Sequence, residues 1–69
     1  KDPQAVDALI AVLHDPDYLC RVAAAHALGN IGDPRAIAVL EPLAKLTGIQ
    51  NLKTAEAAKE ALETLAKGA

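Results

Sequence analysis

Residues 33–37 read Asp-Pro-Arg-Ala-Ile, and they repeat residues 2–6, Asp-Pro-Gln-Ala-Val, at an offset of 31 residues. Further along, the apolar positions of residues 23–31 recur in residues 57–65 at an offset of 34. The second copy therefore contains three extra residues, which we place in a turn at residues 47–51. Repetition at a fixed period of this length is typical of proteins built by stacking one supersecondary unit.

The repeat divides the chain into two units, residues 2–32 and 33–69, and each unit has the pattern of two helices. A capping Asp followed by Pro stands before each of the first three helices, at Asp2-Pro3, Asp15-Pro16 and Asp33-Pro34. We expect the second helix to end near Gly29 and the fourth to begin near Asn51 or Thr54. Pro42 is expected to kink or break the third helix.

Apolar side chains at helical spacing predict the buried face of each helix. They are Val6, Leu9, Ile10 and Leu13; Cys20, Ala23, Ala24, Ala27 and Leu28; Ile37, Leu40, Leu43 and Ala44; and Ala55, Ala58, Leu62 and Leu65. No alternating run of β-branched residues indicates a strand. The predicted fold is all-α, an α-hairpin solenoid of two repeats and four helices.

Composition narrows the classes of function. Hydrophobic residues make up 52% of the 69 residues and the net charge is −2, a balance that argues against disorder. Seven Lys and Arg against nine Asp and Glu argue against a nucleic-acid partner. No apolar run is long enough for a membrane helix. The single cysteine forms no internal disulfide, so we expect a cytoplasmic protein. Because Met is absent, we interpret the chain as a fragment or a processed product.

These residues resemble the HEAT-like repeats of the phycobilisome-lyase type. The resemblance rests on the Asp-Pro-x-Ala-Val/Ile start of each unit and on residues 21–34, RVAAAHALGNIGDP. It covers nearly the whole chain, more weakly in residues 52–67. It implies stacked helix pairs used as binding scaffolds or as parts of enzymes, and an Arg, here Arg21, that ties neighbouring turns.

Two related enzyme classes fit poorly. Deoxyhypusine-hydroxylase-like di-iron repeats carry a His-Glu pair early in the second helix, where this chain has Val22-Ala23 and Glu56-Ala57. DNA glycosylases built from HEAT-like repeats are disfavoured by the acidic charge and the absence of Trp. We therefore assign no catalytic residue, no cofactor and no metal. Whether the protein is an enzyme stays open, and we favour a protein without enzymatic activity.

Several polar residues are expected to be structural. Arg21 is expected to pair with acceptors among Asp15, Asp17 and Asp33. His14 complements the dipole at the end of the first helix, His26 is expected on the surface, and Cys20 is expected to be a small buried hydrophobe.

Candidate partner-binding residues lie on two helices. Tyr18, Val22 and His26 form a small amphipathic stripe, and Tyr is frequent at interfaces. The first helix is apolar over more of its circumference than one internal layer needs, so its side chains are expected to meet a preceding repeat or a second copy of the chain; the candidates are Val6, Ile10 and Leu13.

The second unit carries charges where the first has small or apolar residues. Glu56, Lys59, Glu60 and Glu63 replace Val22, Ala25, His26 and Gly29. We therefore expect residues 33–69 to be a degenerate C-terminal capping repeat. The favoured function is a protein-interaction or scaffold module, as a piece of a larger solenoid or through self-association. The alternative is a non-catalytic part or subunit of a protein similar to bilin lyases.

Overall fold

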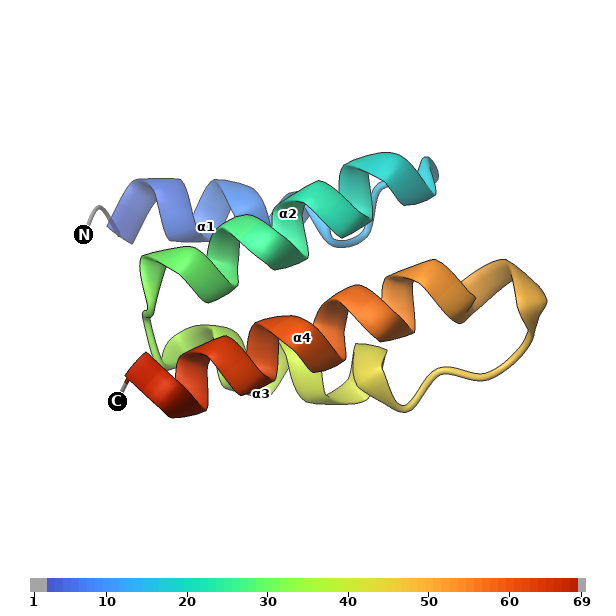
Figure 1. Ribbon diagram of the computed structural model, residues 1–69. Helices are drawn as coiled ribbons and strands as arrows, with labels where there is room; N and C mark the ends of the chain where they lie inside the picture. Colours follow the sequence, from blue (N-terminus) through green and yellow to red (C-terminus); the bar gives the residue numbers. More distant parts are fainter. Residues whose placement is uncertain (1–2, 69) are drawn as a thin grey trace.

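The computed structural model describes residues 3–68, which form four α-helices and no strand. The helices are α1 (Pro3–Val12), α2 (Tyr18–Ile31), α3 (Arg35–Ala44) and α4 (Leu52–Gly68), and a short 3₁₀ helix, η1 (Ile49–Asn51), precedes α4 (Figure 1). α1 and α2 make one antiparallel hairpin, and α3 and α4 make the second. The prediction of an all-α fold with two helical hairpins is confirmed.

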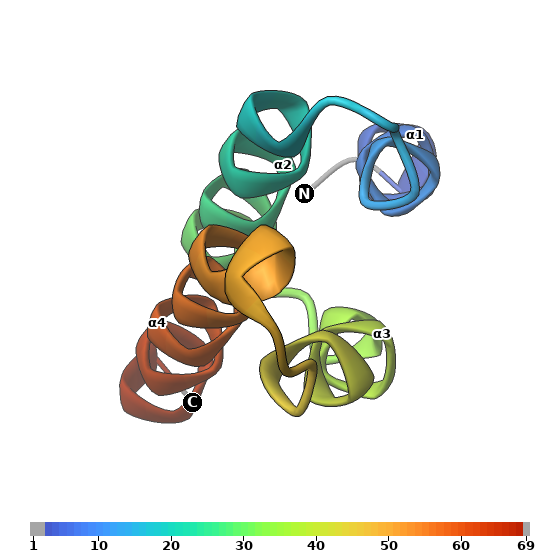
Figure 2. The same ribbon diagram turned by 90° about the vertical axis from the view of Figure 1, so that its right-hand side faces the viewer.

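The four helices form two layers. α2 and α4 lie side by side in one layer, and α1 and α3 lie in the other (Figure 2). The contact of α2 with α4 is the most extensive in the molecule, whereas α1 and α3 touch only lightly. The loops that join α1 to α2 and α3 to α4 lie at the same end of the molecule, which we call the loop end, and the α2–α3 turn lies at the other (Figure 1).

The start of α2 differs from the sequence prediction. α1 begins at Pro3 as expected, while its predicted cap, Asp2, lies outside the described residues. α2 begins at Tyr18 rather than at Asp15-Pro16, because the Asp17 carboxylate accepts the main-chain N–H of Leu19 at 2.9 Å. The Asp15 carboxylate accepts the N–H of Asp17 at 2.8 Å. These local hydrogen bonds favour a turn over residues 15–17 and delay the helix.

The end of α2 is also later than predicted. The helix continues through Gly29 to Ile31 and ends at Gly32, whose φ of 79° lies in the left-handed region that favours glycine. The N–H of Gly32 is bonded to the carbonyl of Leu28 at 3.3 Å. Gly29 therefore has a different role, which is described below.

The second hairpin follows its predicted boundaries closely. The Asp33 carboxylate accepts the main-chain N–H of Arg35 at 2.9 Å, which caps the start of α3. α3 runs through Pro42 and ends two residues later, at Ala44. The predicted insertion coincides with the loop before α4, where Gly48 has a φ of 97° and η1 follows.

One core joins all four helices. Its buried members are mostly Ala and Leu, with Val6, Leu13, Leu28, Leu40 and Leu65 among the larger ones. Three predicted core positions are wrong: Cys20, Ala23 and Ile37 are exposed. The buried residues of α2 are Ala24, Ala25, Leu28 and Gly29, and those of α3 are Ala36 and Leu40. The buried faces of α2 and α3 are rotated from the predicted faces, because each helix packs against the neighbouring repeat as well as against the other helix of its own hairpin.

Candidate functional site

Arg21 joins the two repeats at the loop end of the α2–α4 contact. Its Nε donates to Thr54 Oγ1 on α4 at 3.0 Å, and the Thr54 side chain is buried, with 1% exposed. Its Nη1 donates to the carbonyl oxygens of Asp15 at 2.6 Å and Pro16 at 2.9 Å. One guanidinium therefore holds the α1–α2 loop against α2 and ties α2 to the next repeat.

The acceptor that Asp15 offers to Arg21 is its main-chain carbonyl, whereas a carboxylate was expected. Asp33, another of the three predicted acceptors, receives a hydrogen bond from Arg35 Nε at 3.3 Å. The carboxylates of Asp15 and Asp17 accept main-chain N–H groups, as described above.

Gly29 packs against Ala61 of α4. A Cβ at this position would lie 3.0 Å from Ala61 Cα and 3.1 Å from Ala61 Cβ. Such distances leave no room for a side chain unless the helices move apart. This glycine, in the last turn of α2, therefore permits a short interhelical distance at some cost in helix propensity.

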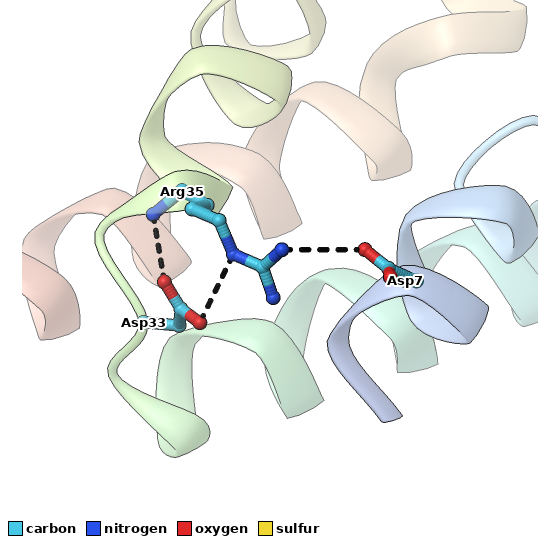
Figure 3. A network of polar contacts seen from close by, with 3 residues as sticks. All are labelled: Asp7, Asp33 and Arg35. Atoms are coloured by element: carbon cyan, nitrogen blue, oxygen red, sulfur yellow. Dashed lines mark hydrogen bonds and ion pairs between the residues drawn. The ribbon is translucent and has the colours of Figure 1, made fainter. Parts of the chain in front are cut away.

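A second polar contact joins α1 to α3. Arg35 Nη1 lies 3.4 Å from Asp7 Oδ1 on α1, and its Nε donates to Asp33 Oδ2 at 3.3 Å (Figure 3). The Arg35 and Asp7 side chains are at least half exposed, so we expect the pair to contribute at most about 1 kcal/mol. The sequence reasoning did not identify this bridge.

The two repeats show how equivalent helix faces differ in burial. Thr54, Ala57 and Ala61 on α4 are buried, and Thr54 and Ala61 contact α2. The residues 34 positions earlier on α2 are Cys20, Ala23 and Ala27, of which the first two are exposed and the third is half-buried. We call these three residues, together with Leu19, the open edge. Leu19 is 62% exposed.

The opposite comparison involves the face of α2 that meets α4. Arg21, Ala25 and Gly29 lie on this face; Ala25 and Gly29 are buried. The α4 residues equivalent to Ala25 and Gly29 are Lys59 and Glu63, and Glu56 is equivalent to Val22, the neighbour of Arg21. All three are exposed, whereas Ala55, the equivalent of Arg21, is buried. We call these three charged residues the closed edge.

Two of the three partner-binding candidates in or directly after α1 are buried inside the chain. Val6 is fully buried and Leu13 is 1% exposed, and Ile10 packs against the same core. Val6 and Leu13 are therefore not available to a partner in this conformation. The half-buried side chains Ala5, Leu9 and Val12 lie beside them on α1. They are equivalent to Ala36, Leu40 and Leu43 of α3, of which Ala36 and Leu40 are fully buried.

Tyr18, Val22 and His26 do not form one free stripe. Val22 packs against the core, and His26 Nε2 lies 3.5 Å from Glu60 Oε2 on α4. Tyr18 is 46% exposed and lies at the loop end, where it helps to line an open hollow described below.

The remaining reactive side chains are on the surface. His14 Nδ1 lies 3.3 Å from the Ile10 carbonyl oxygen at the end of α1. Partial desolvation, together with the carboxylates of Asp15 and Asp17, raises the pKa of the Cys20 thiol above its ordinary value. Within residues 3–68, no three His, Cys, Asp or Glu side chains are placed to hold a metal ion together. No helix in the same range is long and apolar enough to cross a membrane.

A comparison with known families decides the classification. A family model described as HEAT repeats matches residues 1–66. The chain belongs to the HEAT-repeat family. HEAT repeats generally mediate protein–protein interaction as scaffolds, and the two helical hairpins of this chain are two such repeats. No curated protein matches the chain, and no solved structure matches it.

Several residues that position the HEAT-repeat contacts were not found by sequence reasoning. Thr54 and Gly29 are the clearest, since Thr54 accepts from Arg21 and Gly29 allows Ala61 to approach. The offset of 34 residues contains a signal for Thr54, because it places a hydroxyl at the position of Cys20. Burial of Gly29 had no such signal, since glycine near a helix end also suits a C-cap.

Proposed function

We propose that the chain is a protein-interaction module of a HEAT-repeat scaffold, in which the open edge receives another helical hairpin and residues 33–69 cap the stack. The observation that carries this proposal is the difference between Cys20, Ala23 and Ala27 on the open edge and their buried equivalents on α4. In a stacked array, each repeat contacts its neighbours through equivalent faces. The face that α4 uses to contact α2 is therefore present on α2 without an occupant among the described residues.

The chemistry of the open edge suits close packing of a helix. Ala23 and Ala27 are small, as is Ala61, which packs directly against Gly29 in the contact already made. Burying the exposed side chain of Leu19 alone would contribute on the order of 1.5–3 kcal/mol. The half-buried Leu9 and Val12 of α1 extend this surface into the other helical layer.

The chemistry of the closed edge opposes the same packing. Glu56, Lys59 and Glu63 would each lose water if another hairpin stacked on α4, and the penalty for an unpaired buried ion is several kcal/mol. This difference supports a capping role for residues 33–69. It also opposes head-to-tail association, in which the closed edge of one copy would cover the open edge of the next.

Self-association can still use the open edge on its own. Two copies would meet through the same residues about a two-fold axis, which is the commonest symmetry of homodimers. A preceding hairpin and a second copy are thus two occupants of one surface, and the oligomeric state distinguishes them.

Sedimentation of the chain over a concentration series tests self-association through this surface. We expect the wild-type chain to dimerise in the upper micromolar range, on the order of 100 µM, and the Ala23→Glu variant to remain monomeric. Ala66→Glu is the matched control, because Ala66 is an exposed alanine on α4 and lies outside the open edge. Self-association through the open edge would be contradicted by a wild-type chain that remains monomeric at every concentration. It would also be contradicted by an Ala23→Glu variant that dimerises as the wild type does.

The resemblance to phycobilisome-lyase-type repeats supports a second use, as a non-catalytic part of a bilin-lyase-like protein. No described residue is assigned to bilin chemistry. Addition of an open-chain tetrapyrrole tests this alternative: a shifted and saturable absorption band would support it, and an unchanged spectrum at high excess would exclude it.

A further inference from the structure

An open hollow of about 350 Å³ lies at the loop end of the molecule, between the two repeats. It is lined by residues from the start of α2 and its preceding loop and by residues from η1 and the start of α4: Pro16, Tyr18, Arg21, Ile49, Gln50 and Lys53. Its size is at the lower end of the range of small-ligand pockets, which suits one or two side chains better than a large cofactor.

The apolar part of the lining includes a side chain that the fold does not use. Ile49 is 92% exposed and does not belong to the core. It lies within the inserted turn of the second repeat, so the first repeat has no equivalent of it. Tyr18 and Pro16 face the same hollow from the first repeat. Exposed apolar side chains that gather around a hollow with polar groups at its margin are typical of interaction sites.

The charged part of the lining is positive. Arg21 and Lys53 line the hollow, and no carboxylate does. The hydrogen bonds of Arg21 use Nε and Nη1 and leave Nη2 without a partner among the described residues. The Lys53 side chain makes no hydrogen bond or ion pair within residues 3–68. A chain whose net charge is −2 therefore presents two cations beside an apolar wall at this point.

We propose that this hollow binds a short peptide segment of a partner protein in which an Asp or Glu stands next to an aliphatic or aromatic residue. The peptide carboxylate would be bound by Arg21 and Lys53, and the neighbouring apolar side chain would pack against Tyr18 and Ile49. This site lies at the loop end and uses other side chains than the open edge, so it adds a second contact surface and does not depend on the first.

Arg21 is held in place before any ligand arrives. Its hydrogen bonds to Thr54 and to two carbonyl oxygens fix the guanidinium, so little side-chain entropy remains to be lost on binding. Hydrogen bonds from a fixed guanidinium to a carboxylate are among the stronger polar contacts. Lys53 is free to turn toward the same carboxylate.

The direct test is a two-dimensional NMR titration of the ¹⁵N-labelled chain with acetyl-Glu-Leu-Phe-Glu-amide. We expect saturable shifts confined to the amides around Tyr18, Arg21, Ile49 and Lys53. Acetyl-Lys-Leu-Phe-Lys-amide and inorganic phosphate are the comparison ligands. Equal binding of the basic peptide, equal shifts with phosphate alone, or no shift at about 5 mM acidic peptide would overturn the proposal.

Two surface variants identify the side chains responsible. We expect Lys53→Glu to weaken binding of the acidic peptide about tenfold or more, and Ile49→Ser to weaken it several-fold. Lys59→Glu makes the same charge change on α4 outside the hollow and should alter the affinity less than about twofold. All three positions are exposed, so their spectra should retain the wild-type dispersion. Equal effects of Lys53→Glu and Lys59→Glu would show that only net charge matters and would also overturn the proposal.

Discussion

Cys20 and Ala23 are exposed on α2, whereas Thr54 and Ala57, at the same positions of the next repeat, are buried. The reverse holds on the other side of the helices, where Ala25 and Gly29 of α2 are covered and Lys59 and Glu63 of α4 are in solvent. α2 and α4 therefore occupy equivalent places in their repeats but bury opposite faces. Burial in a repeat protein therefore depends on the neighbouring repeat as much as on the helix itself.

The open edge and the closed edge differ in how well they can pack against another helix. The contact between α2 and α4 combines a close backbone approach at Gly29 with the hydrogen bonds of Arg21. The open edge has the small side chains for such a contact, and the closed edge has charges in place of them. Changes at the existing contact should cost stability, and changes at the open edge should alter association alone.

The largest effect is expected from Gly29→Leu. A leucine at this position must displace the Ala61 backbone, which lies 3.0 Å from the Cβ position. We expect the free energy of unfolding to fall by about 3 kcal/mol, which is most of the stability of a domain this small. Urea denaturation followed by circular dichroism measures the change.

Asn30→Leu is the matched control for Gly29→Leu. Asn30 is exposed on the same helix, so its replacement should change the unfolding free energy by no more than about 0.5 kcal/mol. A Gly29→Leu variant as stable as Asn30→Leu would mean that α2 and α4 are not held closely together.

A smaller effect is expected from Arg21→Met. The substitution leaves the buried Thr54 hydroxyl without its partner and frees the carbonyls of Asp15 and Pro16. We expect a loss of about 2 kcal/mol in denaturation experiments. Arg35→Met removes a half-exposed bridge between the same two repeats and should cost less than about 1 kcal/mol. Equal losses for the two variants would contradict the structural role assigned to Arg21.

The smallest effect concerns the chemistry of Cys20 on the open edge. Because its pKa is raised, less thiolate is present at a given pH than in the unfolded chain, and the thiolate is the form that reacts. The pH midpoint of alkylation by iodoacetamide should therefore lie higher for the folded chain than for the chain in urea. A lower midpoint in the folded chain would show that its surroundings are electropositive.

The sequence predicts the helical hairpins because repetition and Asp-Pro capping are local signals. Residues 33–37 repeat residues 2–6 so closely that the second hairpin could be placed from the first. Helix limits near residues 15–18 and 29–32 were less accurate, since Asp15 and Asp17 both suit a cap and Gly29 and Gly32 both suit a terminus. At the start of α2 both carboxylates accept nearby main-chain N–H groups, so the competition is local. At its end Gly29 packs against Ala61 of α4, a contact that no local signal predicts.

The candidate surfaces were harder to predict than the hairpins. Periodicity identifies an apolar face on α1 but does not say which side chains the chain itself covers, and Val6 and Leu13 prove to be internal. The same problem misplaced Cys20, which stands where the next repeat has a buried Thr54. Tyr18 and Ile49 line the hollow at the loop end from different repeats. Ile49 lies in the inserted turn, for which the first repeat has no equivalent, so the repeat pattern does not place it.

The most direct measurement compares two elongated chains. In the first, residues 1–32 are joined to residues 2–69, so that an extra copy of the first hairpin precedes the open edge. In the second, residues 1–68 are joined to residues 33–69, so that an extra hairpin follows the closed edge. Both joints keep the natural Gly-Asp-Pro turn that connects the repeats.

Urea denaturation measures the free energy of unfolding of both chains, and hydrogen exchange measures the protection of the amides of α2 and α4. We expect the first chain to be more stable than the original by about 2–4 kcal/mol, because its new hairpin covers the open edge. This chain contains two copies of Cys20. The copy in the original hairpin should be protected from alkylation, whereas the copy in the added hairpin should stay reactive. The second chain should gain less than about 1 kcal/mol, because its new hairpin meets Glu56, Lys59 and Glu63. Equal gains in both chains, or a gain in the second alone, would contradict an open edge at α2 and a closed edge at α4.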